Sequence, residues 1–108
     1  MSNILICSIV RNQEANLNLW HNQLIELSKL LDGKIYLSVF ENDSLDKTKE
    51  LLEKFSYPFE SIVTCKNFNK RFYGSVWNLE RLKNLAFYRQ ACIDQAFEKW
   101  KEIFFTKV

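Results

Sequence analysis

The chain has 108 residues, which is enough for one small domain with a single core. Apolar residues make up 47% of it and aromatic residues 15%, a composition that excludes intrinsic disorder. The formal net charge is only +2, and no apolar stretch is long enough to span a membrane, so we expect no nucleic-acid partner, no membrane span and a cytoplasmic location.

The first half of the chain predicts two strands separated by a helix. Residues 4–10 form a short, β-branched apolar run, which is typical of a strand buried on both faces. Apolar residues then recur at steps of three and four over residues 13–31, which predicts a helix. Gly33 can take the left-handed conformation that ends such a helix. Residues 34–40 predict the second strand.

The second half predicts two helices and two further strands. A helix is expected over residues 44–55, with Ser44 as its N-cap and Leu45 turned inward. Residues 59–65 predict a weaker strand. A long helix follows over residues 78–99, and a fourth strand over residues 102–106. The expected core stripe of the long helix and its end is Leu79, Leu82, Leu85, Ala86, Ile93, Ala96, Phe97 and Trp100.

Strands that alternate with helices predict an α/β fold with a parallel sheet. We expect one domain over residues 1–108, with a three-layer Rossmann-like sheet of strand order 3-2-1-4. In such sheets a ligand binds at the carboxyl ends of the strands where the order reverses. That point lies between strands one and four, and the loop after strand two borders it.

The polar turn at residues 41–48 is the strongest chemical signal. It places Glu41, Asp43 and Asp46 at the end of the second strand, where carboxylates could accept hydrogen bonds from ribose hydroxyls or a base N–H. The alternative interpretation is a polar turn that only caps a helix.

Four segments in order resemble the motifs of GT-A glycosyltransferases, closest to the capsule-associated α-1,3-mannosyltransferase family and similar to family 2 transferases. The turn at residues 41–48 resembles the acidic motif after the second strand. Residues 8–17 resemble the first-strand motif, residues 81–91 the third-helix motif, and residues 102–105 the strand that delivers a metal-binding motif. This resemblance implies the N-terminal, nucleotide-binding half of a GT-A fold.

The resemblance also assigns roles to individual residues. It implies that Val10 and Arg11, with the adjacent Asn12, border the donor nucleotide and that Glu41 faces its base or ribose. Asp43 would shape the turn beside the donor. A further donor-site residue is Arg89 on the long helix, while the catalytic residues stay unknown.

The expected ligands are a nucleotide-diphosphate sugar as donor and a carbohydrate as acceptor. Mn²⁺ or Mg²⁺ would steady the diphosphate in such enzymes, but Thr106, Lys107 and Val108 stand where the acidic motif is expected, so the sequence assigns no metal ligand. We therefore expect an incomplete glycosyltransferase that a C-terminal half or a partner would complete.

Other functions stay open at this point. The main alternative is a non-catalytic binding or assembly module, which would pair with a second copy or a partner chain through the open edge of strand four. Bases and aromatics alternate over residues 66–73, a pattern that could clamp single-stranded nucleic acid, although a loop beside the donor site is favoured. A receiver-like signalling domain lacks the acidic pair it would need after strand one. Three cysteines without metal-ligand spacing are expected to be buried, apolar-like residues.

Overall fold

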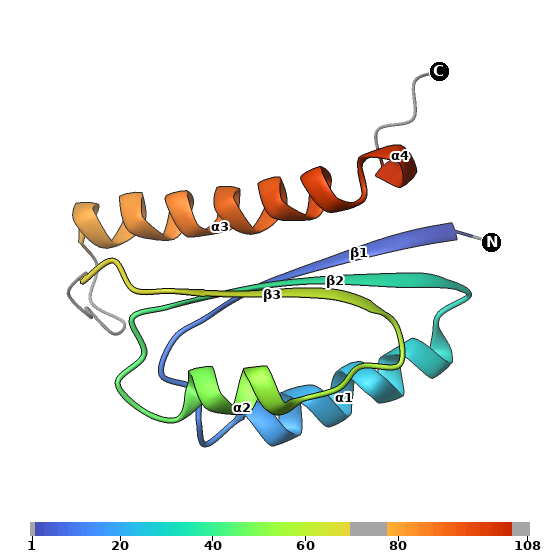
Figure 1. The fold of residues 1–108 in the computed structure, drawn as a ribbon, viewed down its shortest axis with the longest axis horizontal. Coiled ribbons are helices and arrows are strands. Elements are labelled where there is room, and N and C mark those ends of the chain that lie inside the picture. Colours follow the sequence, from blue (N-terminus) through green and yellow to red (C-terminus); the bar gives the residue numbers. More distant parts are fainter. Residues whose placement is uncertain (1, 70–77, 105–108) are drawn as a thin grey trace.

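The computed structural model describes residues 2–69 and 78–104. Its elements along the chain are β1 (Ser2–Val10), α1 (Leu17–Leu30), β2 (Gly33–Asn42), α2 (Thr48–Lys54), β3 (Glu60–Lys66), α3 (Leu79–Lys99) and α4 (Lys101–Phe104). The three strands are parallel and paired in the order β1-β2-β3. Helices α1 and α2 lie on one face of the sheet and α3 on the other (Figure 1). The α/β class is confirmed, and the layered parallel sheet is compatible with a Rossmann-like fold.

The central strand β2 supplies both halves of the core. Side chains alternate across a strand, so Leu37 and Val39 face α1 and α2 while Tyr36 and Phe40 face α3. The first pair belongs to a cluster with Val10, Leu17, Leu24 and Leu52. The second pair packs under α3 with Tyr88, Cys92, Ala96 and Trp100. Burial of apolar surface on both faces of one strand holds the three layers together.

The face of α3 that packs on the sheet differs from the predicted stripe. Ala96 and Trp100 are buried as expected, but Tyr88 and Cys92 complete the buried row. These four residues follow one another at steps of four, which places them on one side of a helix. Leu79, expected in the core, is 67% exposed. Burial is concentrated from Tyr88 onward, toward the C-terminal end of α3.

The predicted fourth strand is wrong over residues 102–104, which belong to the short helix α4. The N–H groups of Ile103 and Phe104 both donate to the carbonyl oxygen of Trp100, at 3.0 and 3.1 Å. The Phe104 ring meets the Tyr36 ring edge-on, with centroids 5.2 Å apart. The apolar residues at this end therefore fold back onto the sheet face. Residues 105–108 lie outside the described part of the chain.

The strand order is therefore observed only in part. The order β1-β2-β3 agrees with the 3-2-1 portion of the expected 3-2-1-4 arrangement. No described residue occupies the fourth position beside β1. The assembly-module alternative needs the open edge of strand four, and the described residues do not form that strand.

Two local predictions need correction. Helix α2 begins at Thr48, so Ser44 is not its N-cap, and Leu45 lies in the preceding turn with 90% of its surface exposed. Gly33 opens β2 instead of ending α1 in the left-handed conformation. A side chain at Gly33 would place its Cβ 2.6 Å from the carbonyl oxygen of Ser2. Glycine is needed here because β1 passes close by.

The remaining expectations concern membranes and cysteines. In residues 2–69 and 78–104, no helix is both long enough and apolar enough to cross a membrane. The three cysteines are free, and only Cys92 is buried as expected. Cys7 is exposed because β1 lies at an edge of the sheet as described.

Candidate functional site

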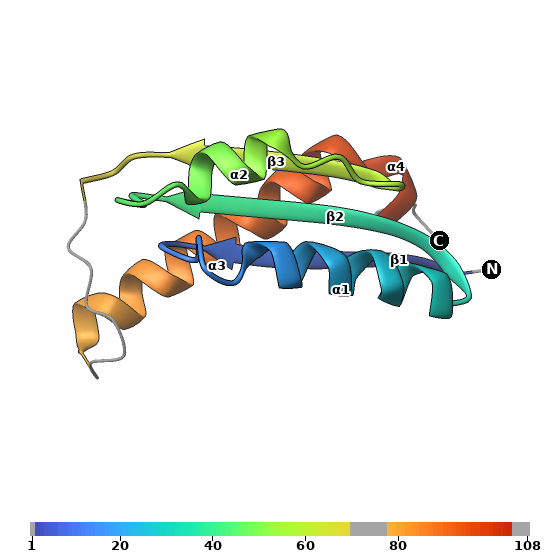
Figure 2. The same cartoon turned by 90° about the horizontal axis from the view of Figure 1, so that it is seen from below.

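The candidate site lies where β1 and β2 end together. Val10 pairs in register with Glu41, so the loop that begins at Arg11 and the turn that begins at Asp43 leave the same edge of the sheet. Figure 2 shows the segments after these two strands at the same end of the molecule. The sequence-predicted residues Val10, Arg11, Glu41 and Asp43 are thus brought to one edge.

Asn12 joins the two segments. Its backbone N–H donates to the Ser44 hydroxyl at 3.0 Å, and its side-chain oxygen accepts from the N–H of Leu45 at 2.7 Å. Asn12 takes a left-handed backbone with φ of 52°, a conformation that asparagine tolerates better than most residues. Asn12 therefore shapes the edge, and Ser44 serves as an acceptor for this loop.

A second set of bonds crosses between the loop and the turn. The N–H of Glu14 donates to Asp46 Oδ2 at 3.1 Å, and Glu14 Oε1 accepts from the N–H of Lys47 at 3.0 Å. The N–H of Gln13 donates to Thr48 Oγ1 at 2.8 Å. Sequence reasoning missed these links, because they join residues more than thirty positions apart.

Asp46 and Thr48 are occupied by this scaffold. Both the N–H and the hydroxyl of Thr48 donate to Asp46 Oδ1. Partial burial alone would raise the pKa of the Asp46 carboxyl, but hydrogen bonds from Thr48 and from the Glu14 backbone outweigh it and hold the pKa below its ordinary value. Asp46 thus stabilises the turn as a charged acceptor.

Glu41 is 3% exposed and does not point into bulk solvent. Its Oε2 accepts from the N–H of Ser44 at 3.0 Å, which closes the turn after β2. The carboxylate also accepts a hydrogen bond from the Cys65 thiol. Burial, reinforced by the nearby Glu41 charge, raises the pKa of Cys65 to about 11. The carboxylate thus lies inside the edge, between the turn after β2 and Cys65 on β3.

Asp43 connects the end of β2 to the segment after β3. Its Oδ1 accepts from the N–H groups of Phe68 and Asn69, at 2.6 and 2.7 Å, and its Oδ2 accepts from the Asn42 side chain at 2.9 Å. Its own N–H donates to the carbonyl oxygen of Lys66 at 3.2 Å. Asp43 is buried and takes a left-handed φ of 50°. The turn-shaping role implied by the sequence resemblance agrees with these contacts.

Comparison with known proteins gives the family. The family model described as Cryptococcal mannosyltransferase 1 matches residues 3–108. The chain belongs to this family. No curated protein and no solved structure matches the chain. The match confirms the resemblance to the capsule-associated mannosyltransferase family, and membership in this family supports a glycosyltransferase-like function in general.

Within this mannosyltransferase-family chain, Tyr88 is a site residue that sequence reasoning missed. The residue is 4% exposed, and its hydroxyl has no hydrogen-bond partner within residues 2–69 and 78–104. Burial raises the pKa of Tyr88, the Asp43 carboxylate raises it further, and the Arg11 guanidinium lowers it. The phenol is therefore within electrostatic reach of both edge residues. The only sequence feature that could have indicated Tyr88 is its position next to Arg89 in the third-helix motif.

The segment after β3 contributes to the aromatic packing at this edge. The Phe68 ring stacks on Phe40, with centroids 6.2 Å apart, and packs at 5.7 Å from the Tyr88 ring. Phe68 is thus an aromatic packing residue, whereas nucleic-acid clamping would require rings free to stack on bases. Residues 70–73, the rest of that predicted pattern, lie outside the described ranges.

The described residues give Arg89 no partner at the donor edge and form no metal-binding group. Arg89 is exposed on α3 and forms no hydrogen bond or ion pair with any residue that the structure describes. No group of three histidine, cysteine or acidic residues able to hold a metal occurs in residues 2–69 and 78–104. The oxygens of Asp43 and Asp46 accept backbone N–H groups instead. The described residues therefore do not fit a divalent metal, and we derive no step through one.

Proposed function

We propose that this chain binds the nucleotide of a nucleotide-diphosphate sugar at the carboxyl edge of β1 and β2, as the donor-binding part of a GT-A glycosyltransferase. The observation that carries the proposal is the pairing of Val10 with Glu41, which brings Arg11 and the acidic turn to one edge. Membership in a mannosyltransferase family supports sugar transfer as the reaction class. The edge position agrees with the general location of ligands in parallel α/β sheets.

The edge residues suit different parts of such a donor. Val10 is 6% exposed and anchors the end of β1 in the core, while the Arg11 guanidinium supplies charge and a planar surface. Asn12, Glu41 and Asp43 hold the surrounding backbone through hydrogen bonds. Any direct contact from Glu41 to a base or ribose would use lone pairs that the turn and the Cys65 thiol do not occupy.

The proposed reaction joins an acceptor hydroxyl oxygen to the anomeric carbon of the donor sugar. The bond between that carbon and the diphosphate oxygen breaks, the diphosphate leaves with the bonding electron pair, and the acceptor hydroxyl releases its proton to the solvent. Positive charge near the leaving group favours this step because negative charge develops there. Arg11 is the cation that directly follows β1 at this edge, and we assign it to this electrostatic role.

The test is a thermal-stability titration with GDP- and UDP-sugars, with and without Mn²⁺. A ligand at a hundred times its dissociation constant stabilises the folded state by about 2.7 kcal/mol. We expect stabilisation by at least one donor and its loss in Arg11→Gln. Arg89→Gln should also lose it if the role implied by the sequence resemblance is correct.

Lys29→Gln is the matched control, because Lys29 is exposed on α1 and its ion pair with Glu26 lies at the surface. This control should behave as the unchanged protein. Absence of stabilisation by every donor would refute the proposal. If a nucleotide sugar stabilises Arg11→Gln as much as it stabilises the control, Arg11 does not contribute to the donor site.

A further inference from the structure

Cys7 of β1 and Cys92 of α3 lie in the same layer, between the sheet and the helix that covers it. Side chains alternate across a strand. On β1, Leu5 and Ile9 pack in the clusters under α3, whereas Ile6 packs in the cluster on the other face of the sheet. Cys7 lies between Leu5 and Ile9 in this alternation, so its side chain is on the face that α3 covers.

The Cys92 sulfur lies over the strand residue that pairs with Cys7. Cys7 is in register with Ser38 of β2, and paired residues of neighbouring strands stand side by side on one face of a sheet. Cys92 Sγ is 3.2 Å from the Ser38 carbonyl oxygen and 3.4 Å from its hydroxyl oxygen. It is also 3.6 Å from the carbonyl oxygen of Ser8, the residue that follows Cys7. A hydrogen bond between the Cys7 and Cys92 thiols accompanies this arrangement.

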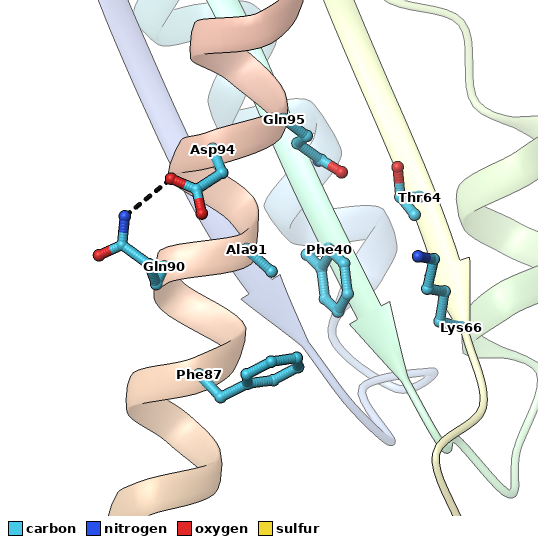
Figure 3. Close-up of a pocket in the computed structure, with 8 residues that line it drawn as sticks. All are labelled: Phe40, Thr64, Lys66, Phe87, Gln90, Ala91, Asp94 and Gln95. Carbon is cyan, nitrogen blue, oxygen red and sulfur yellow. Dashed lines mark hydrogen bonds between the residues drawn. The ribbon is translucent and has the colours of Figure 1, made fainter.

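Hydrogen bonds hold this part of α3 on the sheet. The Ser38 hydroxyl donates to the carbonyl oxygen of Cys92 at 2.7 Å, and Gln95 Nε2 donates to the same hydroxyl at 2.8 Å. Figure 3 shows α3 over the strands here, with Ala91, the neighbour of Cys92, turned toward Phe40. The groove of about 490 Å³ drawn in Figure 3 is on the β3 side of α3, and neither cysteine lines it. Cys92 is thus fixed on the β1 side of the helix.

The two thiols differ in their access to solvent. Cys7 is exposed on the edge strand β1, whereas Cys92 is 0% exposed. A small oxidant can therefore reach the Cys7 sulfur and not the Cys92 sulfur. An accessible thiol beside a second thiol that resolves its oxidised form is the usual arrangement of a redox-sensitive cysteine pair.

We propose that Cys7 and Cys92 are a disulfide-forming pair, which a low-molecular-weight disulfide converts into a cross-link between β1 and α3. The Cys7 thiol loses its proton, and its sulfur attacks one sulfur of the small disulfide and releases the other as a thiolate. The Cys92 thiol then loses its proton, and its sulfur attacks the Cys7 sulfur and releases the second small thiolate. The two cysteines lose two electrons and two protons, and the small disulfide, which gains both, becomes two thiols.

This pair does not depend on the proposed function, but its position bears on the candidate site. Tyr88 lies one helical turn before Cys92 on α3, and Val10 follows Cys7 on β1. A cross-link would hold α3 against β1 close to the carboxyl edge. Oxidation would therefore restrict movement of the helix that carries Tyr88.

Cys65 is a control within the same chain. Val63 of β3 packs in the cluster under α1 and α2, and Cys65, two residues later, is on that same face. Its thiol donates to the Glu41 carboxylate. Because the sheet separates Cys65 from the layer of Cys7 and Cys92, it cannot pair with either while the chain is folded.

The experiment is oxidation of the purified chain with oxidised glutathione, followed by alkylation and peptide mass spectrometry without reduction. The incubation is at about pH 8.5, because the raised pKa of Cys7 leaves little thiolate at neutral pH. We expect the Cys7–Cys92 link to exceed the glutathione adduct of Cys7 by about tenfold or more, since an adjacent thiol has a much higher effective concentration than free glutathione. Cys65→Ser should form the link in unchanged yield.

Two further variants test the order of the steps. Cys92→Ala should stop at the glutathione adduct of Cys7, because the resolving thiol is missing. Cys7→Ser, a change at an exposed position, should fold normally and form neither the adduct at this position nor a link between Cys92 and Cys65. A stable Cys7 adduct in the unchanged protein, or links that include Cys65, would overturn the proposal.

Urea unfolding gives a second readout on the oxidised chain. A link between residues 7 and 92 closes a long loop in the unfolded chain, so the urea midpoint should rise by about 1 M or more and should return to its original value after reduction with dithiothreitol. If the linked chain unfolds at the same or a lower urea concentration than the reduced chain, the native packing does not accommodate the link and the proposal is wrong.

Discussion

Asp43 offers a quantitative test of what stabilises the edge, because its side chain, at the end of β2, accepts hydrogen bonds from the segment after β3. Replacement by alanine leaves the N–H groups of Phe68 and Asn69 without their acceptor, at a cost of about 1–3 kcal/mol each. Alanine also tolerates the left-handed backbone poorly, which adds about 1–2 kcal/mol. We expect a total loss of about 3–8 kcal/mol, against a free energy of unfolding of about 5–15 kcal/mol for a typical folded protein.

Two further variants divide this loss into its parts. Asp43→Asn keeps an oxygen acceptor and tolerates the backbone, so we expect it to lose only about 1–2 kcal/mol. Asp43→Gly relieves the backbone but lacks the acceptor, so its stability should fall between the other two. Urea unfolding followed by tryptophan fluorescence measures all three, with exposed Asp32→Ala as control. If Asp43→Ala loses no more than this control, the contacts of Asp43 do not stabilise the edge.

Three other predictions follow from pKa values and hydrogen bonding. The pKa of Asp46 is lower in the folded than in the unfolded state, so its contribution to folding stability is present at neutral pH and is lost as the pH falls through the folded pKa. The stability difference between the unchanged protein and Asp46→Asn should therefore shrink below about pH 4. A difference that grows at lower pH would contradict this assignment. Cys7 is exposed, but partial desolvation by the protein beside it, and then the Cys92 thiol, raise its pKa to about 11. Because the thiolate is the reactive form, iodoacetamide should alkylate Cys7 about a hundredfold more slowly at neutral pH than a thiol of ordinary pKa. Mass spectrometry checks this, and labelling at the ordinary rate would refute it. Tyr88→Phe should leave urea stability unchanged or higher because the hydroxyl has no partner to lose; a loss above about 1 kcal/mol would show a structural bond there.

Sequence periodicity predicted the described strands and the long helices, because those elements follow local hydrophobic patterns. Residues 34–40 lie within β2, and the helix expected at residues 78–99 is α3 with Asn78 as its cap. The Asn78 side chain accepts from the N–H groups of Glu80 and Arg81, a short-range contact that sequence can indicate.

The failures occurred where distant residues decide the local structure. Residues 102–104 have the apolar composition of a strand, but their packing against Tyr36 folds them into a helical turn. Ser44 has the chemistry of an N-cap, yet its hydroxyl accepts from Asn12, thirty-two positions earlier. Propensity and periodicity carry no information about such partners.

The sequence predicted where the candidate site lies, but it did not predict which contacts its residues make. The carboxyl edge and the residues Val10, Arg11, Glu41 and Asp43 follow from strand order and register. That Glu41 closes a turn and that Tyr88 lies near Asp43 depend on how α3 and β3 pack, which no single segment encodes. The assignment of these residues to a nucleotide stays a prediction.

The reciprocal bonds of Glu14 with the residues Asp46 and Lys47 have a consequence for ligand recognition. Loops that cross-link each other lose their separate freedom, so neither can swing aside without the other. A molecule arriving at this edge would meet a rim whose shape is already set, and little conformational entropy would be lost on association. The edge would then distinguish between similar ligands by its preformed shape, and movement of the loops after binding would contribute little.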